Sequence, residues 1–371
     1  MTGGGTRVVH VSGFYPPHLG GAERVVEQLA RLQAQTRRVT VHTSAAGGGP
    51  ATDRDCDGRL RVVRHRTWVV AHTPVAPGML TALLRKRPAP DVLHVHTGQA
   101  LIPEIGWLAS RLRGVPYVAH VHLVVRPSSA AGRVLLPVYD RMLFGPFLRR
   151  AQRVICLTGA MRDEVLTRYR VPRERVRIVP NGVDLSRPAP GTDARAAREL
   201  LFVGRLVEQK NVLAAVEAMA ELPRDVTLRI VGEGELAPRI RARIDELGLS
   251  NVRLEGRMDP AELAAAYRRA AALLMPSSHE GMPLVLLEAL AAGVPVLCSR
   301  IPELVEVGGD AVLTVDPVTS QRLAAAVRGL LADDPGRALL SARARDRAAR
   351  YEWSTVACSV DAVYAEVRSA W

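Results

Sequence analysis

Two glutamates stand eight residues apart in the segment HEGMPLVLLEALAAG (279–293). A glycine follows Glu280, so we expect this residue to lie in a loop, and the apolar run around Glu288 predicts a helix. Carboxylates accept paired hydrogen bonds from hydroxyl groups, such as those of a sugar or a ribose. A carboxylate in an apolar run also needs a partner, which favours a binding role for Glu288. The alternative is that Glu280 caps the helix and Glu288 is a solvated side chain.

The start of the same helix offers backbone N–H groups. First-turn amides have no acceptor inside a helix, and the positive end of the helix dipole lies beside them. Pro283 lacks an N–H group but suits a first turn. We therefore expect a phosphate or a hydroxyl group to be held by four amides, those of Gly281, Met282, Leu284 and Val285.

A second pair of candidate residues lies in FVGRLVEQKN (202–211). Gly204 and Arg205 end a predicted strand, and Lys210 precedes a predicted helix. The planar guanidinium of Arg205 and the compact charge of Lys210 suit a diphosphate. Among the 50 basic residues only Lys86 and Lys210 are lysines, which indicates that position 210 requires a lysine. The alternative is that both are exposed surface cations.

Two glycine pairs follow predicted strands. Gly20 and Gly21 precede a predicted helix, where positive φ angles and free amides would let an anion approach the backbone. Gly232 and Gly234, in VGEGE (231–235), would allow the close approach of a flat base or a ribose. In both places a turn without a ligand is the alternative.

Four histidines alternate along two predicted strands, His94 and His96 within 91–98 and His120 and His122 within 117–124. Side chains two residues apart share a face of a strand, so each pair points to one side. The cluster raises a metal site as a hypothesis. No carboxylate is spaced to complete such a site, so we favour buried histidines that bond to the backbone.

Alternating strands and helices must position these residues. In the first half, strands are predicted over 7–13, 39–44, 91–98, 117–124 and 153–160, and helices over 22–35 and 103–114. In the second half, strands are predicted over 200–206, 226–235, 252–258, 272–278 and 294–300, and helices over 211–222, 236–249, 260–270 and 282–293. This alternation predicts an α/β fold with two doubly wound parallel sheets.

We expect two domains, over 1–185 and 199–352, joined by a linker rich in proline and glycine over 186–198. A final helix is predicted within 353–371, and packing of this helix against the first domain is one expectation. Ligands of doubly wound sheets bind beyond the carboxyl ends of the strands. Two such domains would therefore face a central cleft suited to a reaction of two substrates.

The composition excludes several classes of protein. The chain has 371 residues, of which 48% are hydrophobic and 23% charged, as in globular proteins. The aromatic fraction of 4% and the lack of a binding motif argue against a nucleic-acid partner. No apolar run is long enough to span a membrane, and the first residues lack the layout of a secretory signal. The four cysteines are far apart, so we expect reduced thiols and a cytoplasmic protein.

The net charge of +13 is unevenly distributed. Residues 1–185 carry 27 basic and 12 acidic residues, whereas residues 186–371 carry 23 and 25. An anionic membrane surface and an anionic substrate both fit a basic first half, and so does an arginine-rich bacterial coding bias without a partner. The basic stretches 85–87 and 147–153 and the amphipathic stretch 130–150 could touch a membrane, but we favour a core helix with a basic edge for the last.

Taken together and in order, six motifs resemble a known family: FYPPHLGGAER, PYVAHVHL, VPNGVD, VGRLVEQKN, VGEGE and the E-x7-E signature that begins at Glu280. The chain is similar over nearly its whole length to retaining glycosyltransferases of family 4, which have the two-domain GT-B architecture. The resemblance implies an acceptor-binding first domain and a nucleotide-sugar donor domain in the second half. His120 stands where many members have Thr or Ser, a difference that bears on the acceptor.

The resemblance also implies roles for the candidate residues. Glu280 would hold hydroxyl groups of the donor sugar, Glu288 the ribose, and His122 would lie near the reacting sugar. Arg205 and Lys210 would neutralise the diphosphate in place of a metal, and with Glu280 and His122 they form the expected catalytic set. The remaining expected donor-binding residues are Gly20, Gly21, Gly204, Gly232, Gly234, Arg257, Gly281, Met282, Leu284 and Val285. No cofactor or metal is expected, since no Asp-x-Asp motif is placed to bind one, and Asp333–Asp334 lies in a predicted surface loop.

We therefore expect transfer of a hexosyl or N-acetylhexosaminyl group from a nucleotide-diphosphate sugar, UDP-linked first and GDP-linked next, to a hydroxyl acceptor. The acceptor is a small molecule, a natural-product core or a lipid-linked glycan at the inner membrane face. No carboxylate is placed as a nucleophile, so retention would come from front-face attack. A nucleotide-sugar 2-epimerase of the same architecture and a non-catalytic module that binds anions are the alternatives.

Overall fold

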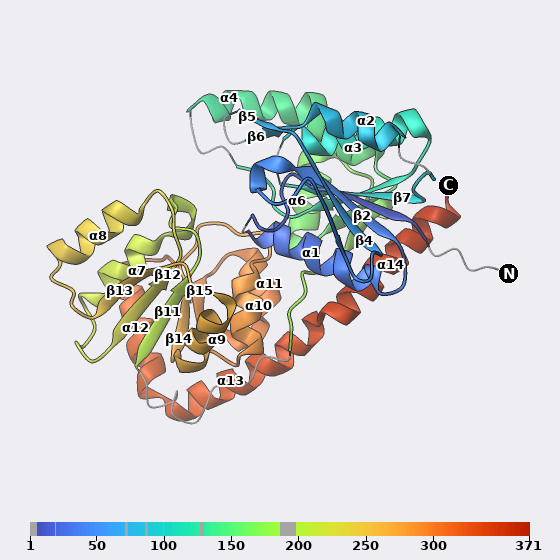
Figure 1. The fold of residues 1–371 in the computed structure, drawn as a ribbon. Helices are drawn as coiled ribbons and strands as arrows, with labels where there is room; N and C mark the ends of the chain where they lie inside the picture. The colour runs from blue at the N-terminus through green and yellow to red at the C-terminus, as the bar shows by residue number, and fades with distance from the viewer. Residues whose placement is uncertain are drawn as a thin grey trace. The chain divides into compact units, whose positions relative to one another are not determined.

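The computed structural model describes residues 6–18, 20–70, 73–85, 88–98, 100–126, 130–185 and 198–371. The chain forms two compact units (Figure 1). Unit 1 contains Met1–Asn181 and Trp353–Trp371, and unit 2 contains Gly182–Glu352. The predicted linker, 186–198, lies outside the described residues except for Arg198.

Unit 1 contains an eight-stranded sheet in the order β10-β9-β8-β7-β1-β2-β4-β3. All neighbouring pairs are parallel except β3 and β4, which are antiparallel at the edge. The strands are β1 (Val8–Val11), β2 (Val39–Ser44), β3 (Thr52–Asp55), β4 (Leu60–His65), β7 (Val92–Thr97), β8 (Tyr117–Val121), β9 (Arg153–Cys156) and β10 (Val176–Ile178), and β5 (Trp68–Val70) and β6 (Thr73–Val75) form a separate hairpin. The central strands are buried along their length, as their apolar sequences predict.

The helices of unit 1 lie on both faces of this sheet (Figure 1). They are α1 (Gly21–Ala34), α2 (Pro77–Arg85), α3 (Ile102–Arg113), α4 (Ala130–Tyr139), α5 (Gly145–Arg150), α6 (Gly159–Tyr169) and α14 (Trp353–Ser369). Helix α3 ends at Gly114, whose φ of 60° is left-handed, as predicted for a glycine C-cap. Helix α14 packs against α1, β7 and β8, and Glu366 on it pairs with Arg153 and Arg177 at 2.7 Å. The end of the chain is therefore part of the same unit as its beginning.

Unit 2 contains a six-stranded parallel sheet in the order β13-β12-β11-β14-β15-β16. Its strands are β11 (Glu199–Val203), β12 (Thr227–Val231), β13 (Val252–Gly256), β14 (Ala272–Met275), β15 (Val296–Ser299) and β16 (Val312–Val315). Its helices are α7 (Val212–Met219), α8 (Ala237–Glu246), α9 (Pro260–Arg269), α10 (Leu284–Ala291), α11 (Pro302–Gly308), α12 (Ser320–Ala332) and α13 (Asp334–Ala348). Leucine, valine and alanine side chains of α7, α12, β11 and β12 form a buried core on one face of the sheet.

Both sheets reverse their strand order beside the first strand of the unit. In unit 1, β1 lies between β2 and β7, and in unit 2, β11 lies between β12 and β14. In doubly wound sheets, ligands bind beyond the carboxyl ends of the strands at such a reversal, here beside the loops that follow β1 and β7 and those that follow β11 and β14. The fold thus fixes one candidate ligand position in each unit before any side chain is considered.

The stretch 130–150 is not simply a core helix. It forms α4, a wide helical turn over Asp140–Phe144 and α5. Phe147 and Leu148 are buried, whereas α4 exposes Val134, Leu135 and Val138, and the wide turn exposes Met142. The interpretation of this stretch as a core helix is therefore wrong for α4 and right for α5.

No helix among the described residues is long and apolar enough to cross a membrane. The four cysteines are free, as expected from their spacing. Burial raises the pKa of the Cys156 and Cys298 thiols to about 12, so both stay protonated at neutral pH.

The loops after β11 and β12 are in direct backbone contact. Gly204 N–H donates to Val231, and Leu206 N–H donates to Glu233, at 3.0 and 2.9 Å. A Cβ atom at Gly232, whose φ is 141°, would come within 1.9 Å of the Gly204 carbonyl oxygen. Gly232 therefore makes room for the chain's own backbone, and the approach of a base or a ribose to this loop stays a prediction. Gly234 meets the backbone of Leu206 in the same way.

One face of the unit 1 sheet is lined with buried histidines from β1, β7 and the end of β8: His10, His94, His96, His120 and His122. Desolvation by burial lowers the pKa of His10 and His122 to about 4, and it lowers the pKa of the other three as well. All five are therefore neutral at pH 7. They bond to one another, to Gln33 and to Tyr364, so the expectation that strand histidines bond to the backbone is wrong.

Replacement of Gly232 by alanine should destabilise the protein by about 2–4 kcal/mol, because it adds backbone strain and a clash with Gly204. Gly329 is the control position. It lies within α12, away from both ends of the helix, and is exposed with open space around it. Gly329→Ala should stabilise the protein by about 0.5–1 kcal/mol. Urea unfolding of both variants measures these changes, and equal stabilities would contradict the assigned contact.

Mild acid should destabilise unit 1 through its buried neutral histidines. Between pH 6.5 and about 4, the unfolded chain binds protons at the five buried histidines and the folded chain does not. The free energy of unfolding therefore falls as the pH falls through this window, by about 1.4 kcal/mol per pH unit for each histidine. Urea unfolding at about pH 7.5 and about pH 5.5 tests this. Equal free energies of unfolding at the two pH values would show that the histidines are not buried as neutral groups.

Candidate active site

An ion pair lies where the unit 2 sheet reverses its strand order. Lys210 follows β11 at the end of a short helical turn (Glu208–Lys210), and Glu280 lies in the loop after β14. The two strands are neighbours in the sheet. The distance from Lys210 Nζ to Glu280 Oε1 is 2.5 Å, and the side chains are 16% and 5% exposed. The two candidate residues, 70 positions apart in sequence, are therefore each other's partner.

Gln209 fixes the two loops relative to each other. Its carbonyl oxygen accepts the Ser278 N–H at 2.8 Å, and its side-chain Nε2 donates to the His279 carbonyl oxygen at 2.7 Å. These two bonds join Gln209, which directly precedes Lys210, to Ser278 and His279, the two residues before Glu280. Sequence reasoning missed Gln209, because a glutamine in a loop carries no signal of its partner.

Glu288 is buried within α10 and pairs with a residue of the neighbouring helix α9. The Tyr267 hydroxyl donates to Glu288 Oε2 at 3.1 Å, and the residue is 3% exposed. The expectation that this carboxylate needs a partner is confirmed, and the solvated alternative is wrong. The tyrosine itself was not predicted.

Helix α10 starts at Leu284, with Pro283 as its N-cap and no side-chain cap. We expected Pro283 within the first turn, but it lies directly before that turn. The amides of Leu284 and Val285 have no acceptor inside the helix. Both lie at the N-terminal end of α10, which is the end close to Glu280 in the sequence. Gly281 and Met282 are buried in the loop between Glu280 and Pro283.

Two further arginines differ in their surroundings. Arg205 is exposed, and in the described part of the chain it forms no ion pair. Arg257 is also exposed and pairs with Glu233 at 2.7 Å. The structure records no contact of either with Lys210 or Glu280. Gly204 lies beside the Lys210 stem, since a Cβ atom there would be 3.8 Å from Lys210 Cε.

In unit 1, Gly20 and Gly21 lie at the start of α1 after β1. Neither uses a left-handed φ, because Gly20 is extended at −174° and Gly21 belongs to the helix, so that part of the prediction is wrong. Gly20 instead makes room for a carboxylate: a Cβ atom there would meet Glu23 Oε2 at 2.1 Å. Glu23 is buried and pairs with His18 at 3.3 Å.

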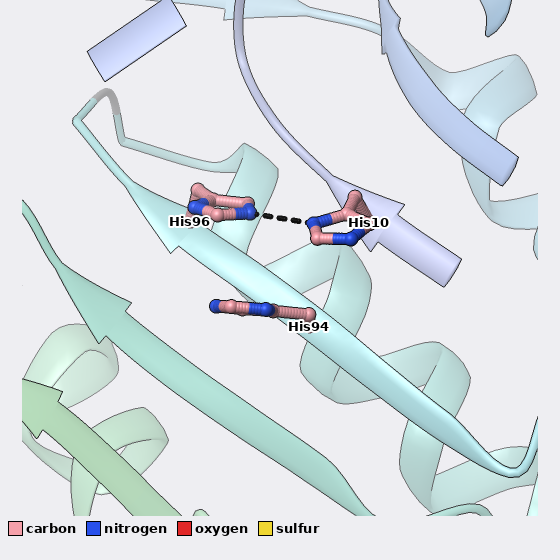
Figure 2. Close-up of side chains that lie close together, drawn as sticks. All are labelled: His10, His94 and His96. Atoms are coloured by element: carbon pink, nitrogen blue, oxygen red, sulfur yellow. Dashed lines mark hydrogen bonds between the residues drawn. The ribbon is translucent and has the colours of Figure 1, made fainter. Parts of the chain in front are cut away.

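His122 lies directly after β8, at the carboxyl end of the unit 1 sheet. Its Nε2 atom is 2.9 Å from His96 Nδ1, and His96 Nε2 is 2.9 Å from His10 Nδ1. Figure 2 shows His10 on β1 in line with His96 on β7, and the His94 ring parallel to the His96 ring. Sequence reasoning found the four histidines of β7 and β8 but missed His10, which stands alone in an apolar strand.

Two triads of this cluster bring three imidazole nitrogens close together: His10, His94 and His96, and His96, His120 and His122. Imidazole lone pairs lie in the ring plane and must converge to bind one ion. The His94 and His96 rings are stacked, with centroids 4.2 Å apart and an interplanar angle of 17°, so their lone pairs run parallel. Each ring is also bonded to another ring of the cluster. The geometry favours neutral hydrogen-bonded chains over a metal centre.

Two family models match the chain: "Glycosyltransferase Family 4" over residues 19–187 and "Glycosyl transferases group 1" over residues 193–347. Two solved structures are similar in fold. Sucrose-phosphate synthase from Thermosynechococcus elongatus has a TM-score of 0.79 at 22% identity, with 99% of this chain and 100% of that chain covered. Anabaena HepE, in complex with UDP and glucose, has a TM-score of 0.81 at 18% identity, with 97% and 100% covered.

Curated relatives are closer in sequence. Glycogen synthase of Mycobacterium tuberculosis is 31% identical over 96% of this chain and 94% of the relative. D-inositol 3-phosphate glycosyltransferase of Thermobispora bispora is 36% identical over 74% and 70%. The chain has two doubly wound α/β units, and a Lys–Glu pair lies at the strand reversal of the second. Both family models match it, and relatives match it over nearly its full length. The chain is therefore a glycosyltransferase that belongs to family 4 and has the GT-B fold.

Proposed function

We propose that the chain transfers a hexosyl group from a UDP-linked sugar to a hydroxyl acceptor with retention of configuration, and that Lys210 and Glu280 form the centre of the donor site. The observation that carries this proposal is their ion pair at the strand reversal of unit 2. A cation for the diphosphate and a carboxylate for sugar hydroxyl groups lie together at the edge of the sheet where ligands bind.

When the donor binds, Lys210 and Glu280 each exchange the other for a group of the donor. The diphosphate offers Lys210 two negative charges in place of one, and Glu280 is then free to accept hydrogen bonds from two hydroxyl groups of the sugar. The amides of Leu284 and Val285 supply further donors at the start of α10. Arg205, exposed and without an ion pair among the described residues, is the second cation for the diphosphate.

The chemical step follows from the placement of charge. The bond between the anomeric carbon and the diphosphate oxygen breaks, and the acceptor oxygen bonds to the anomeric carbon on the same face. The acceptor proton passes to the departing phosphate oxygen. Lys210, Arg205 and the amides of α10 stabilise the charge that develops on the leaving group without reorganising. On this proposal the cations of the chain do the work that a divalent metal does elsewhere.

UDP is the first choice of nucleotide, and GDP the next. HepE, similar in fold, has been solved with UDP and with UDP-glucose. A nucleotide-sugar 2-epimerase remains the second enzymatic candidate, since it would use the same donor site and need no acceptor. The product separates the two: an epimerase converts the nucleotide sugar into its 2-epimer, and a transferase forms a glycoside and releases the nucleoside diphosphate.

The acceptor side belongs to unit 1. Its excess of arginine and the exposed apolar side chains of α4, including Val134, Leu135 and Val138, support contact with an anionic lipid surface and a lipid-linked acceptor. Of the basic stretch 85–87, only Arg85 lies within the described residues. A phosphorylated small molecule would use the same positive charge without the apolar face.

Nucleotide binding should raise the melting temperature without added metal. At about 100 times its Kd, UDP adds about 2.7 kcal/mol to the native state, and GDP, ADP and dTDP should add less. The double variant Lys210→Met/Glu280→Gln removes both charges, leaves no unpaired buried charge, and should abolish the shift. The control is Arg239→Ala, which removes an exposed cation paired with Glu208 and should keep it. A shift that survives in the double variant would place the nucleotide elsewhere.

Turnover should fall more than binding does. Lys210→Ala and Arg205→Ala each remove a group that stabilises the leaving diphosphate, so kcat for UDP release from UDP-glucose should drop about 10²- to 10³-fold. Circular dichroism and melting curves check that each variant is folded. Near-normal turnover in both folded variants would refute the proposed roles.

A further inference from the structure

Two chains of hydrogen-bonded histidines meet at one amide, that of Gln33 on α1. In the first chain, Gln33 Oε1 is 2.9 Å from His10 Nε2, His10 Nδ1 is 2.9 Å from His96 Nε2, and His96 Nδ1 is 2.9 Å from His122 Nε2. In the second, Gln33 Nε2 is 3.3 Å from the Tyr364 hydroxyl, which is 2.5 Å from His94 Nδ1, and His94 Nε2 is 3.1 Å from His120 Nδ1. Each neutral ring has one N–H and one bare nitrogen, so a proton position fixed at one end fixes every position along the chain.

Asp361 on α14 orients the amide of Gln33. Gln33 Nε2 lies 3.4 Å from Asp361 Oδ1, and Arg37 pairs with the other carboxylate oxygen. A carboxylate only accepts hydrogen bonds, so the NH₂ group of Gln33 faces Asp361 and Tyr364, and its oxygen faces His10. The ion pair with Arg37 thus connects the buried amide to a fixed charge near the surface.

The first chain then has a single direction. His10 Nε2–H donates to Gln33 Oε1, which leaves His10 Nδ1 bare to accept from His96 Nε2–H. His96 Nδ1 is in turn bare and accepts from His122 Nε2–H. His122 Nδ1 is therefore an acceptor, and it is buried with no hydrogen-bond partner among the described residues. Figure 2 shows the link in the middle of this chain, between His10 and His96.

The second chain is set by the other half of the same amide. Tyr364 accepts from Gln33 Nε2, so its hydroxyl proton is directed to His94 Nδ1. Burial raises the pKa of Tyr364, which keeps that proton in place. His94 Nε2–H then donates to His120 Nδ1, and His120 carries its proton on Nε2. The rings of the two chains stack on one another, but among the described residues the two chains share only Gln33 through hydrogen bonds, so the proton positions of one chain can be changed without those of the other.

We propose that Gln33, oriented by Asp361, is a positioning residue that holds His122 in the Nε2–H tautomer and so presents a bare Nδ1 acceptor at the carboxyl end of β8 to a hydroxyl group of a carbohydrate substrate. The proposal rests on the proposed function for the identity of the ligand, but the tautomer follows from the apo chain alone. A buried acceptor without a partner favours a hydroxyl donor in the bound state.

The direct test is nitrogen-15 NMR of the full chain labelled at histidine, in which long-range proton–nitrogen correlations distinguish a protonated ring nitrogen from a bare one. The His122 signal is assigned by its loss in His122→Asn. We expect His122 to be protonated at Nε2 and bare at Nδ1 at neutral pH. Protonation at Nδ1 in the unmodified protein would overturn the proposal, with no variant needed.

Two nearly isosteric variants test the role of the amide. Gln33→Leu should let His122 populate both tautomers while His94 and His120 keep theirs, because Tyr364 still donates to His94. Tyr364→Phe is the matched control and should do the reverse, releasing His94 and His120 and leaving His122 unchanged. If Gln33→Leu leaves His122 in a single tautomer, or if both variants change the tautomers of both chains alike, Gln33 does not set the tautomer of His122.

A kinetic readout separates this proposal from the proposed function. Gln33→Leu should lower kcat at least fivefold and leave the Kd for UDP unchanged, because unit 2 is untouched. If the unmodified protein shows no transfer from any nucleotide sugar, the proposed function fails while the tautomer result stands. Spectra recorded with added Zn²⁺ and with a chelator should be identical, and a change on metal addition would replace the hydrogen-bonded chains by a metal site.

Discussion

The ion pair between Lys210 and Glu280 is the interaction on which the account of unit 2 depends. Glu280 is buried and Lys210 is half-buried, so each charge is best tolerated beside the other, and the loops after β11 and β14 hold them within hydrogen-bond distance. Gln209 ties these loops together, and the glycines after β12 let its loop pack against the backbone that leads to Lys210. On our proposal a diphosphate replaces Glu280 as the partner of Lys210, which would link donor binding to the geometry of these loops.

Unit 1 buries neutral hydrogen-bonded side chains instead of an ion pair. Its histidines carry no charge at neutral pH and bond to one another in chains that start at Gln33. Helix α14 completes the arrangement, because it supplies both Tyr364 and Asp361. Helix α14 is therefore a direct part of the hydrogen-bonded chains on the face of the unit 1 sheet.

Much of the fold and the identity of the candidate residues could be predicted from the sequence, but their partners could not. Glu280 and Lys210 were chosen for their type and local setting, yet the register of two distant loops decides that they touch. Gly232 and Gly234 were chosen for the approach of a base or a ribose, which stays a prediction, whereas their packing against the backbone of Gly204–Leu206 gave no signal in the sequence. His10, Gln33 and Tyr364 gave no signal, since their roles arise from strand order and helix packing. The strand TDRD (β3) is polar and exposed, so no hydrophobic pattern could reveal it.

The central claim is that the nucleotide diphosphate takes Lys210 from Glu280 at the strand reversal of unit 2. A crystal structure of the chain with bound UDP tests it most directly. We expect the diphosphate to contact Lys210 Nζ between the loops after β11 and β14, and the bond from Nζ to Glu280 to be broken. A diphosphate bound away from these loops, or a Lys210–Glu280 pair that stays intact beside it, would contradict the account.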